Sequence, residues 1–122
     1  MSKKVLVVDD SVTVRQQVSS VLEQAGYAVD EAEDGQAGAE KIEADSGISM
    51  VICDVNMPRM NGIEMVGRVK KDGARAELPI VMLTTEGNPA LIAKAKELGA
   101  KGWIVKPFKA DHLLAAVNKL TA

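Results

Sequence analysis

The chain has 122 residues, of which 47% are hydrophobic and 26% are charged. This length predicts a single globular domain, residues 1–122, that buries its own core. The net charge of −2 disfavours nucleic acid or an anionic membrane as a partner, and no apolar run approaches the roughly 20 residues that span a bilayer. With one cysteine and no secretory signal pattern, the sequence predicts a cytoplasmic protein.

Five short apolar runs alternate along the chain with segments of helical periodicity. The runs predict strands at residues 5–8, 28–32, 50–53, 80–83 and 103–105. Four of them are almost continuously apolar, which is typical of strands buried on both faces, whereas Asp30 and Glu31 indicate that the second is an edge strand. The pattern predicts an α/β fold of the (βα)5 type, in which a doubly wound parallel five-stranded sheet carries helices on both faces.

Capping residues mark the expected ends of the helices. Thr13 and Gln16 fit a capping box at the start of the first helix. A glycine after a helix and an Asp or Asn before one are typical terminal residues. Further helix ends are therefore expected at Gly26, Asp34, Gly73, Asn88 and Gly99.

Polar residues follow four of the apolar runs. They are Asp9 and Asp10, Asp54, Thr84 and Thr85, and Lys106. Ligands of doubly wound sheets bind beyond the carboxyl ends of the strands, so we expect these side chains to meet at one edge. Two carboxylates about 4 Å apart repel each other by roughly 4 kcal/mol at an effective dielectric near 20. Such a cluster favours a hard divalent cation, and Mg²⁺ is the natural choice.

With a metal bound, these residue types indicate phosphoryl transfer. Asp54 stands alone at its strand end and is the predicted nucleophile, whereas Asp9 and Asp10 form the predicted metal cradle. Thr84 would donate a hydrogen bond to the transferred group, and Lys106 would neutralise its charge.

Four segments closely resemble the receiver domains of bacterial two-component response regulators. They are residues 5–11, 53–62, 78–84 and 106–108, and the resemblance in their order and spacing extends over essentially the full chain. The resemblance implies a flavodoxin-like fold with strand order 2-1-3-4-5. It also implies that Asp54 accepts a phosphoryl group from a histidine kinase or a phosphotransfer protein. Beyond its own phosphorylation and dephosphorylation, such a protein is not an enzyme.

The resemblance assigns the metal ligands by position. Asp10 and Asp54 would bind Mg²⁺ directly, with Mn²⁺ as a possible substitute, and Asp9 would act through water. The main-chain carbonyl of Asn56 would complete the protein ligands. The peptide bond before Pro107 is expected to be cis.

Residues around the site are implied to tune the switch. Thr84 would move toward the phosphoryl group together with an aromatic residue, here Trp103, and Thr85, Glu86 and Pro107 would modulate the site. Trp103 is bulkier than the Tyr or Phe common in the family, and Thr85 replaces a frequent small residue. We therefore expect slower turnover or weaker coupling than is usual.

We expect no output domain after the last predicted helix, and we therefore expect the molecule to act by changing the partners that its surface binds. The implied surface for a downstream protein consists of the fourth helix, the fifth strand and the fifth helix. The chain is expected to be a monomer. Its pattern most resembles chemotaxis-type single-domain regulators, and a relay intermediate or a regulator of another pathway remains an alternative.

Three other functions fit the residues less well. An aspartate-nucleophile phosphatase usually has a second acid two residues beyond the nucleophile, where Asn56 stands. A flavin-binding protein would need a phosphate loop rich in hydroxyl groups and glycine after the first strand. A pseudo-receiver that only binds proteins would not need the complete set of acceptor, metal and phosphate residues.

Overall fold

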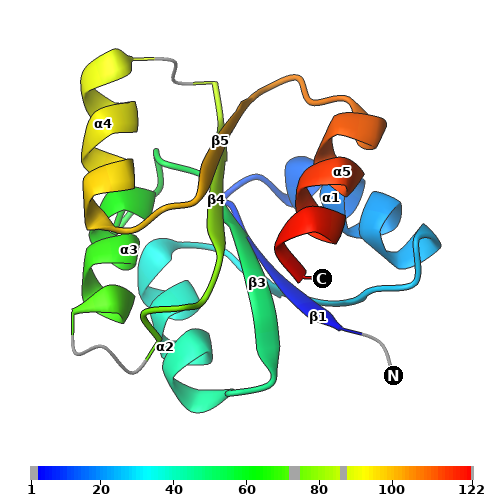
Figure 1. The fold of residues 1–122 in the computed structure, drawn as a ribbon, viewed down its shortest axis with the longest axis horizontal. Helices are drawn as coiled ribbons and strands as arrows, with labels where there is room; N and C mark the ends of the chain where they lie inside the picture. Colours follow the sequence, from blue (N-terminus) through cyan, green and yellow to red (C-terminus); the bar gives the residue numbers. More distant parts are fainter. Residues whose placement is uncertain (1–2, 72–74, 86–87, 122) are drawn as a thin grey trace.

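The computed structural model describes residues 3–71, 75–85 and 88–121, and in these ranges five strands alternate with five helices (Figure 1). The elements are β1 (Lys4–Val8), α1 (Val12–Gln24), β2 (Ala28–Ala32), α2 (Gly35–Ala44), β3 (Ile48–Cys53), α3 (Gly62–Lys70), β4 (Ile80–Thr84), α4 (Pro89–Leu98), β5 (Gly102–Val105) and α5 (Ala110–Thr121). All five predicted strands are confirmed. The third begins two residues earlier than predicted, and the fourth includes Thr84.

The strands form one parallel sheet in the order β2-β1-β3-β4-β5. Figure 1 shows α1 and α5 on one side of the sheet and α2, α3 and α4 on the other. This is the flavodoxin-like, doubly wound architecture expected from the sequence, with the acidic strand β2 at an edge as predicted. Because β1 and β3 are neighbours, their carboxyl ends lie side by side at the point where the strand order reverses.

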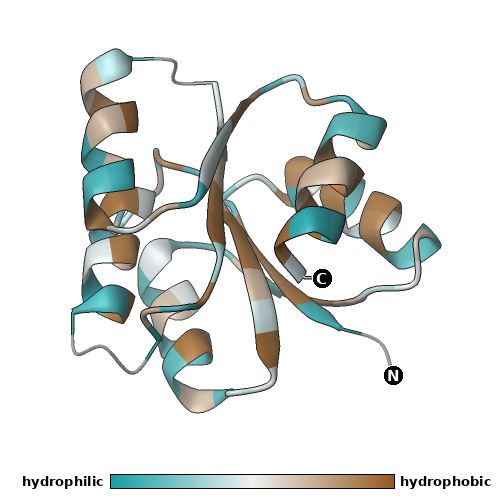
Figure 2. Ribbon diagram, in the orientation of Figure 1, coloured by the Kyte–Doolittle hydropathy of each residue, from teal (hydrophilic) through white to brown (hydrophobic). Residues whose placement is uncertain are grey.

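The sheet divides the hydrophobic core into two layers. Leu6 and Val8 pack in the layer covered by α2, α3 and α4, whereas Val5 and Val7 pack in the layer covered by α1 and α5. Successive residues of a strand point to opposite faces, so β1 contributes to both layers. Figure 2 shows the hydrophobic residues along the strands and the hydrophilic ones mainly on the helices and loops. No helix among the described residues has both the length and the apolar character of a membrane span.

The first helix begins at a different cap from the one predicted. Ser11 is the N-cap residue of α1, and its Oγ accepts a hydrogen bond from the backbone N–H of Val14 at 3.3 Å. The predicted capping box of Thr13 and Gln16 is wrong, because the chain turns into the helix almost directly after β1 and both residues are already helical. The predicted ends at Gly26, Asp34, Asn88 and Gly99 are confirmed, and Gly73 lies outside the described residues.

Two glycines allow α2 and α3 to begin against the loop that follows β3. A Cβ atom on Gly62 would lie 2.0 Å from the carbonyl oxygen of Asp54, and one on Gly35 would lie 2.3 Å from the carbonyl oxygen of Met60. The N–H of Gly62 donates to the carbonyl of Val55 at 2.9 Å, and the N–H of Gly35 donates to that of Met60 at 3.0 Å. The loop after Asp54 is therefore held by backbone contacts that no larger residue would permit.

We expect Gly62→Ala to lower the free energy of unfolding by at least about 2 kcal/mol, because the added methyl group would meet backbone that cannot move aside cheaply. Gly67→Ala, in the middle of α3, is the matched control, since its Cβ would meet only the side chain of Leu98, at 3.7 and 4.0 Å. Alanine should stabilise that helix by roughly 0.5–1 kcal/mol. Urea unfolding of both variants measures the difference, and equal midpoints for Gly62→Ala and the unsubstituted protein would contradict the close packing.

Candidate functional site

Two aspartates directly follow the neighbouring strands β1 and β3. The backbone N–H of Asp9 donates to the carbonyl of Ala32 at 3.1 Å, and that of Asp54 donates to the carbonyl of Val8 at 2.9 Å. The sheet hydrogen bonding thus continues into both aspartates and fixes where they lie. Asp9 is only 2% exposed and Asp54 only 7% exposed. The apolar strands therefore place two nearly buried carboxyl groups at the same edge of the sheet.

Lys106, the residue after β5, lies between these carboxyl groups. Its Nζ donates to Oδ2 of Asp9 at 2.8 Å and to Oδ2 of Asp54 at 3.4 Å. Its backbone N–H donates to the carbonyl of Thr84 at 2.9 Å, which ties the start of the loop after β5 to the end of β4. One ammonium group therefore neutralises part of the charge of both acids.

The second oxygen of each buried carboxylate accepts a hydrogen bond from a nearby backbone N–H group. Oδ1 of Asp9 accepts from Ser11 at 2.9 Å, and Oδ1 of Asp54 accepts from Val55 at 2.7 Å. Both carboxylates are thus held at both oxygens, one by backbone and one by Lys106. This arrangement fixes their orientation.

Asp10 contributes a third carboxyl group, which is exposed to solvent. One carboxylate oxygen from each of Asp9, Asp10 and Asp54 lies within 4.8 Å of the others. Oxygen ligands of this kind suit a hard cation, and the exposure of Asp10 leaves room for the water molecules that Mg²⁺ retains. The three residues predicted to form an acidic cluster do so, and their chemistry fits a Mg²⁺ site.

Burial and charge shift the pKa values of the paired groups. Burial raises the pKa of Asp9, and the hydrogen bonds from Lys106 and Ser11 only partly oppose this. Burial acts to lower the pKa of Lys106, but Asp9 and Asp54 outweigh it and the pKa is raised overall. Asp9 therefore takes up a proton more readily in the folded protein than in the unfolded chain.

Three further predicted site residues lie around this centre. Thr84 is fully buried and is the last residue of β4, whereas the apolar pattern of the sequence predicts it just beyond the strand. Thr85 is exposed, and together with Pro107 it lines a groove beside Lys106, between α1 and the segment after β5. The peptide bond between Lys106 and Pro107 is cis, as expected.

Of the remaining predicted residues, the structure describes Asn56 and Trp103. Asn56 is exposed, two residues beyond Asp54. Trp103 is half-buried in β5, is paired with Met82 of β4, and packs against the core layer covered by α2, α3 and α4. Glu86 lies outside the described residues. The ligand, switch and modulating roles of Asn56, Trp103 and Glu86 remain predictions.

Arg15 contacts the site but is not predicted by the sequence patterns. Nη1 of Arg15, in α1, donates to the backbone carbonyl of Asp9 at 2.6 Å. A cationic residue on a helix is ordinary, so neither composition nor spacing distinguishes it. Only the packing of α1 against the end of β1 reveals the contact.

Comparison with known proteins gives a consistent result. The model of the family described as the response regulator receiver domain matches residues 5–118. The chain is 44% identical over 106 residues to the chemotaxis protein CheY1 of Helicobacter pylori, which covers 86% of each protein. It is 37% identical over 120 residues to the chemotaxis protein CheY of Bacillus subtilis, which covers 98% of each. A solved structure of CheY4 from Vibrio cholerae has a TM-score of 0.91 and 42% identity, covering 98% of this chain and 99% of that one.

We expect Asp54→Asn to raise the melting temperature of the metal-free protein at pH 7 by about 4 °C, or roughly 1 kcal/mol for a domain of this size. The substitution removes one of three neighbouring negative charges and keeps an oxygen for the N–H of Val55. The gain should shrink as the pH falls from the raised pKa of Asp9 toward its ordinary value of 3.8, because protonation of the folded state relieves the same repulsion. Thermal unfolding monitored by circular dichroism between pH 4 and 8 measures this.

Glu97→Gln is the matched control for that experiment, because it removes an exposed carboxylate in the last turn of α4 that does not belong to the acidic cluster. It should leave the melting temperature nearly unchanged. Saturating Mg²⁺ should reverse the order of Asp54→Asn and the unsubstituted protein. A metal-free melting temperature for Asp54→Asn equal to or below that of the unsubstituted protein would show that repulsion among the acids is negligible.

Proposed function

The chain belongs to the family of response regulator receiver domains, and from this premise we propose that it is a single-domain signalling switch, residues 1–122, that is phosphorylated on Asp54. The observation that carries the proposal is the contact of one ammonium group, that of Lys106, with both Asp9 and Asp54 in a cluster of three acids. Receiver domains are signalling proteins, and no substrate beyond the phosphodonor is required.

Asp54 is the proposed nucleophile. A carboxylate oxygen of Asp54 forms a bond to the phosphorus of a phosphohistidine on a histidine kinase or phosphotransfer protein. The P–N bond breaks, its electron pair stays with the imidazole, and the imidazole takes up a proton as it leaves. The hydrogen bonds to Asp54 from Val55 and Lys106 support this role, because they hold the carboxylate in one orientation for in-line attack.

Mg²⁺ is the proposed cofactor, with Mn²⁺ as an alternative. Asp10 and Asp54 would hold it directly, Asp9 would hold it through water, and the main-chain carbonyl of Asn56 would add a ligand. When bound, the metal supplies positive charge that offsets the charge of the transferred group. The acidic cluster supports this assignment, because its three residues offer carboxylate oxygens and such an ion prefers oxygen ligands.

Lys106 and Thr84 are the proposed contacts of the phosphoryl oxygens. The ammonium of Lys106 already lies 3.4 Å from Oδ2 of Asp54, so a group attached there would form within its reach. The buried hydroxyl group of Thr84 and the half-buried Trp103 would then shift together as the switch. Thr85 and Pro107, which border the groove beside Lys106, would modulate access along with Glu86.

The proposed downstream surface consists of α4, β5 and α5. Its support is an exposed apolar residue on an edge strand: Val105 is 51% exposed in β5. The chemotaxis proteins among the relatives support a role in chemotaxis, with a phosphorelay intermediate as the alternative. We also propose that the protein acts in the cytoplasm as a monomer.

Treatment with acetyl phosphate or beryllofluoride in the presence of Mg²⁺ should add one phosphoryl or beryllofluoride group per molecule. The adduct should be absent from Asp54→Asn and present in Asp111→Asn, whose exposed carboxylate on α5 serves as the control. Native mass spectrometry detects both adducts. A full adduct on Asp54→Asn would show that another residue is the acceptor. In a separate assay, continuous hydrolysis of a chromogenic phosphoester would favour an aspartate-nucleophile phosphatase instead.

Trp103 is the only tryptophan of the chain, so its fluorescence reports on the proposed switch. Addition of beryllofluoride and Mg²⁺ should change its emission maximum and its quenching by iodide, because a rotation of the indole ring changes its exposure. Asp54→Asn should show neither change. Identical emission and quenching of the unsubstituted protein with and without beryllofluoride would remove Trp103 from the switch and leave the phosphoacceptor assignment intact.

A further inference from the structure

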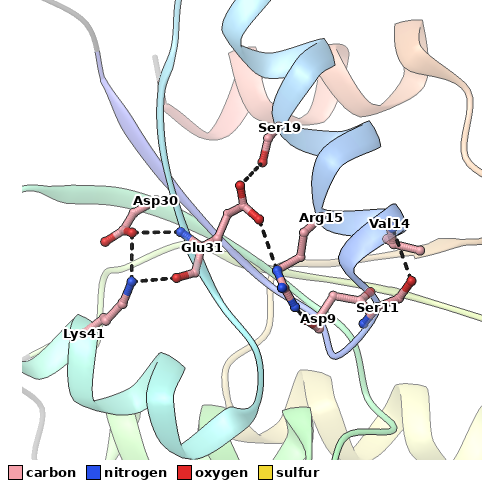
Figure 3. A network of polar contacts seen from close by, with 8 residues as sticks. All are labelled: Asp9, Ser11, Val14, Arg15, Ser19, Asp30, Glu31 and Lys41. Carbon is pink, nitrogen blue, oxygen red and sulfur yellow. Dashed lines mark hydrogen bonds and ion pairs between the residues drawn. The ribbon is translucent and has the colours of Figure 1, made fainter.

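Arg15 joins the end of β1 to the edge strand β2 (Figure 3). Its Nη1 donates to the backbone carbonyl of Asp9 at 2.6 Å, and its Nε donates to Oε1 of Glu31 at 3.1 Å. The Arg15 side chain is only 15% exposed. A guanidinium group is planar and rigid, so two of its N–H groups that are bound to different elements fix the distance between those elements.

Glu31 is itself held from two sides. The Oγ of Ser19, one turn along α1 from Arg15, donates to Oε2 of Glu31 at 3.3 Å. Nζ of Lys41, from α2, donates to the backbone carbonyl of Glu31 at 2.6 Å and to the carboxylate of Asp30 at 2.9 Å. Figure 3 shows these contacts as one continuous network from α2 through β2 to α1 and Asp9. Glu31, which anchors Arg15, is therefore held in place by both α1 and α2.

The carbonyl that Arg15 binds lies where the chain leaves the sheet. The N–H of Asp9 still bonds to β2, through the carbonyl of Ala32, but the residues after it turn into α1. The peptide unit between Asp9 and Asp10 is bonded through its carbonyl to Arg15. The orientation of that peptide sets where Asp10 lies relative to Asp9, because it joins the two residues and the N–H of Asp9 is already held by the sheet.

We propose that Arg15, anchored by Glu31, is a positioning residue that orients the peptide between Asp9 and Asp10, so that their carboxylates and that of Asp54 converge on one cation. This rests on the proposed Mg²⁺ site. Arg15 acts through the backbone carbonyl of Asp9 and touches neither the metal nor the phosphoryl group.

The sign of the effect on Mg²⁺ affinity separates positioning from simple electrostatics. A cation beside three acids repels a second cation, so removal of the Arg15 charge alone should strengthen Mg²⁺ binding. Loss of the fixed peptide orientation should weaken binding, because the ligands would no longer be held in place. The two explanations therefore predict changes in opposite directions.

The test compares Arg15→Met with Arg68→Met. Arg68 also bridges two elements through an Arg–Glu pair, since its Nε and Nη2 donate to Glu43 at 3.0 and 2.8 Å between α3 and α2. That pair contacts no carbonyl of the site, so Arg68→Met controls for the loss of a charge and an ion pair. Isothermal titration calorimetry with MgCl₂ at 25 °C gives the dissociation constants, and thermal unfolding shows that each variant is folded at that temperature.

Arg15→Met should weaken Mg²⁺ binding about tenfold, as is typical when a group that orients a metal ligand is lost. Arg68→Met should leave the dissociation constant unchanged. Arg15→Lys keeps the charge but cannot reach both partners in the same way, so its affinity should lie between those of Arg15→Met and the unsubstituted protein. Unchanged or tighter Mg²⁺ binding by Arg15→Met, or equal weakening by Arg68→Met, would overturn the proposal.

The double variant Arg15→Met/Glu31→Gln tests whether the two residues act as a unit. If Glu31 acts only by holding Arg15, the double variant should bind Mg²⁺ as Arg15→Met does. Weaker Mg²⁺ binding by the double variant than by Arg15→Met would overturn the role of Glu31 as the anchor. If the unsubstituted protein binds no Mg²⁺, this proposal and the proposed metal site fail together. If Mg²⁺ binds and Arg15→Met weakens it but Asp54 takes up no phosphoryl group, only the proposed function fails.

Discussion

At the carboxyl edge of the sheet, the ammonium of Lys106 lies between two nearly buried carboxylates, and the surrounding structure keeps all three groups in place. Asp9 and Asp54 cannot move away from each other, because the sheet hydrogen bonding of β1 and β3 extends into both residues. Lys106 is fixed in turn by the contact of its backbone with the end of β4. Three acids against one ammonium leave the site short of positive charge, and this shortage explains why a divalent cation would bind there.

The loops around this centre are held by backbone and charge contacts from the neighbouring helices. The segment after Asp54 lies against the first residues of α2 and α3, where Gly35 and Gly62 leave space for it. The ion pair between Asp34 and Arg59, at 3.5 Å, adds a side-chain contact, and Arg59 adopts a left-handed backbone conformation with φ of 65°. On the other side of the site, Arg15 and Ser11 hold the segment after β1. Both acid-bearing loops are therefore attached to helices that pack on the sheet.

The sequence was sufficient to predict the alternation of strands and helices and the acidic cluster, because both follow from short-range patterns, whereas the strand order was implied only by the family resemblance. Apolar runs locate the strands, and the residues that follow them must meet at one edge once the sheet is parallel. The cap of α1 was predicted wrongly because Ser11 and Thr13 are both suitable residues, and only the course of the chain after Asp9 decides between them. The role of Arg15 could not be predicted from its position in the sequence, because one partner, Asp9, follows β1 and the other, Glu31, lies in β2.

The charged network on β2 has a consequence for how the molecule behaves at high concentration. An edge strand exposes unpaired backbone groups that can add a strand from another chain, and charged side chains on that strand oppose such pairing. In β2, Asp30 and Glu31 provide the charges, and Lys41 covers part of the backbone by binding the carbonyl of Glu31. At the other edge, β5 has only four residues. The contacts that steady the site at one edge thus also protect the sheet against aggregation.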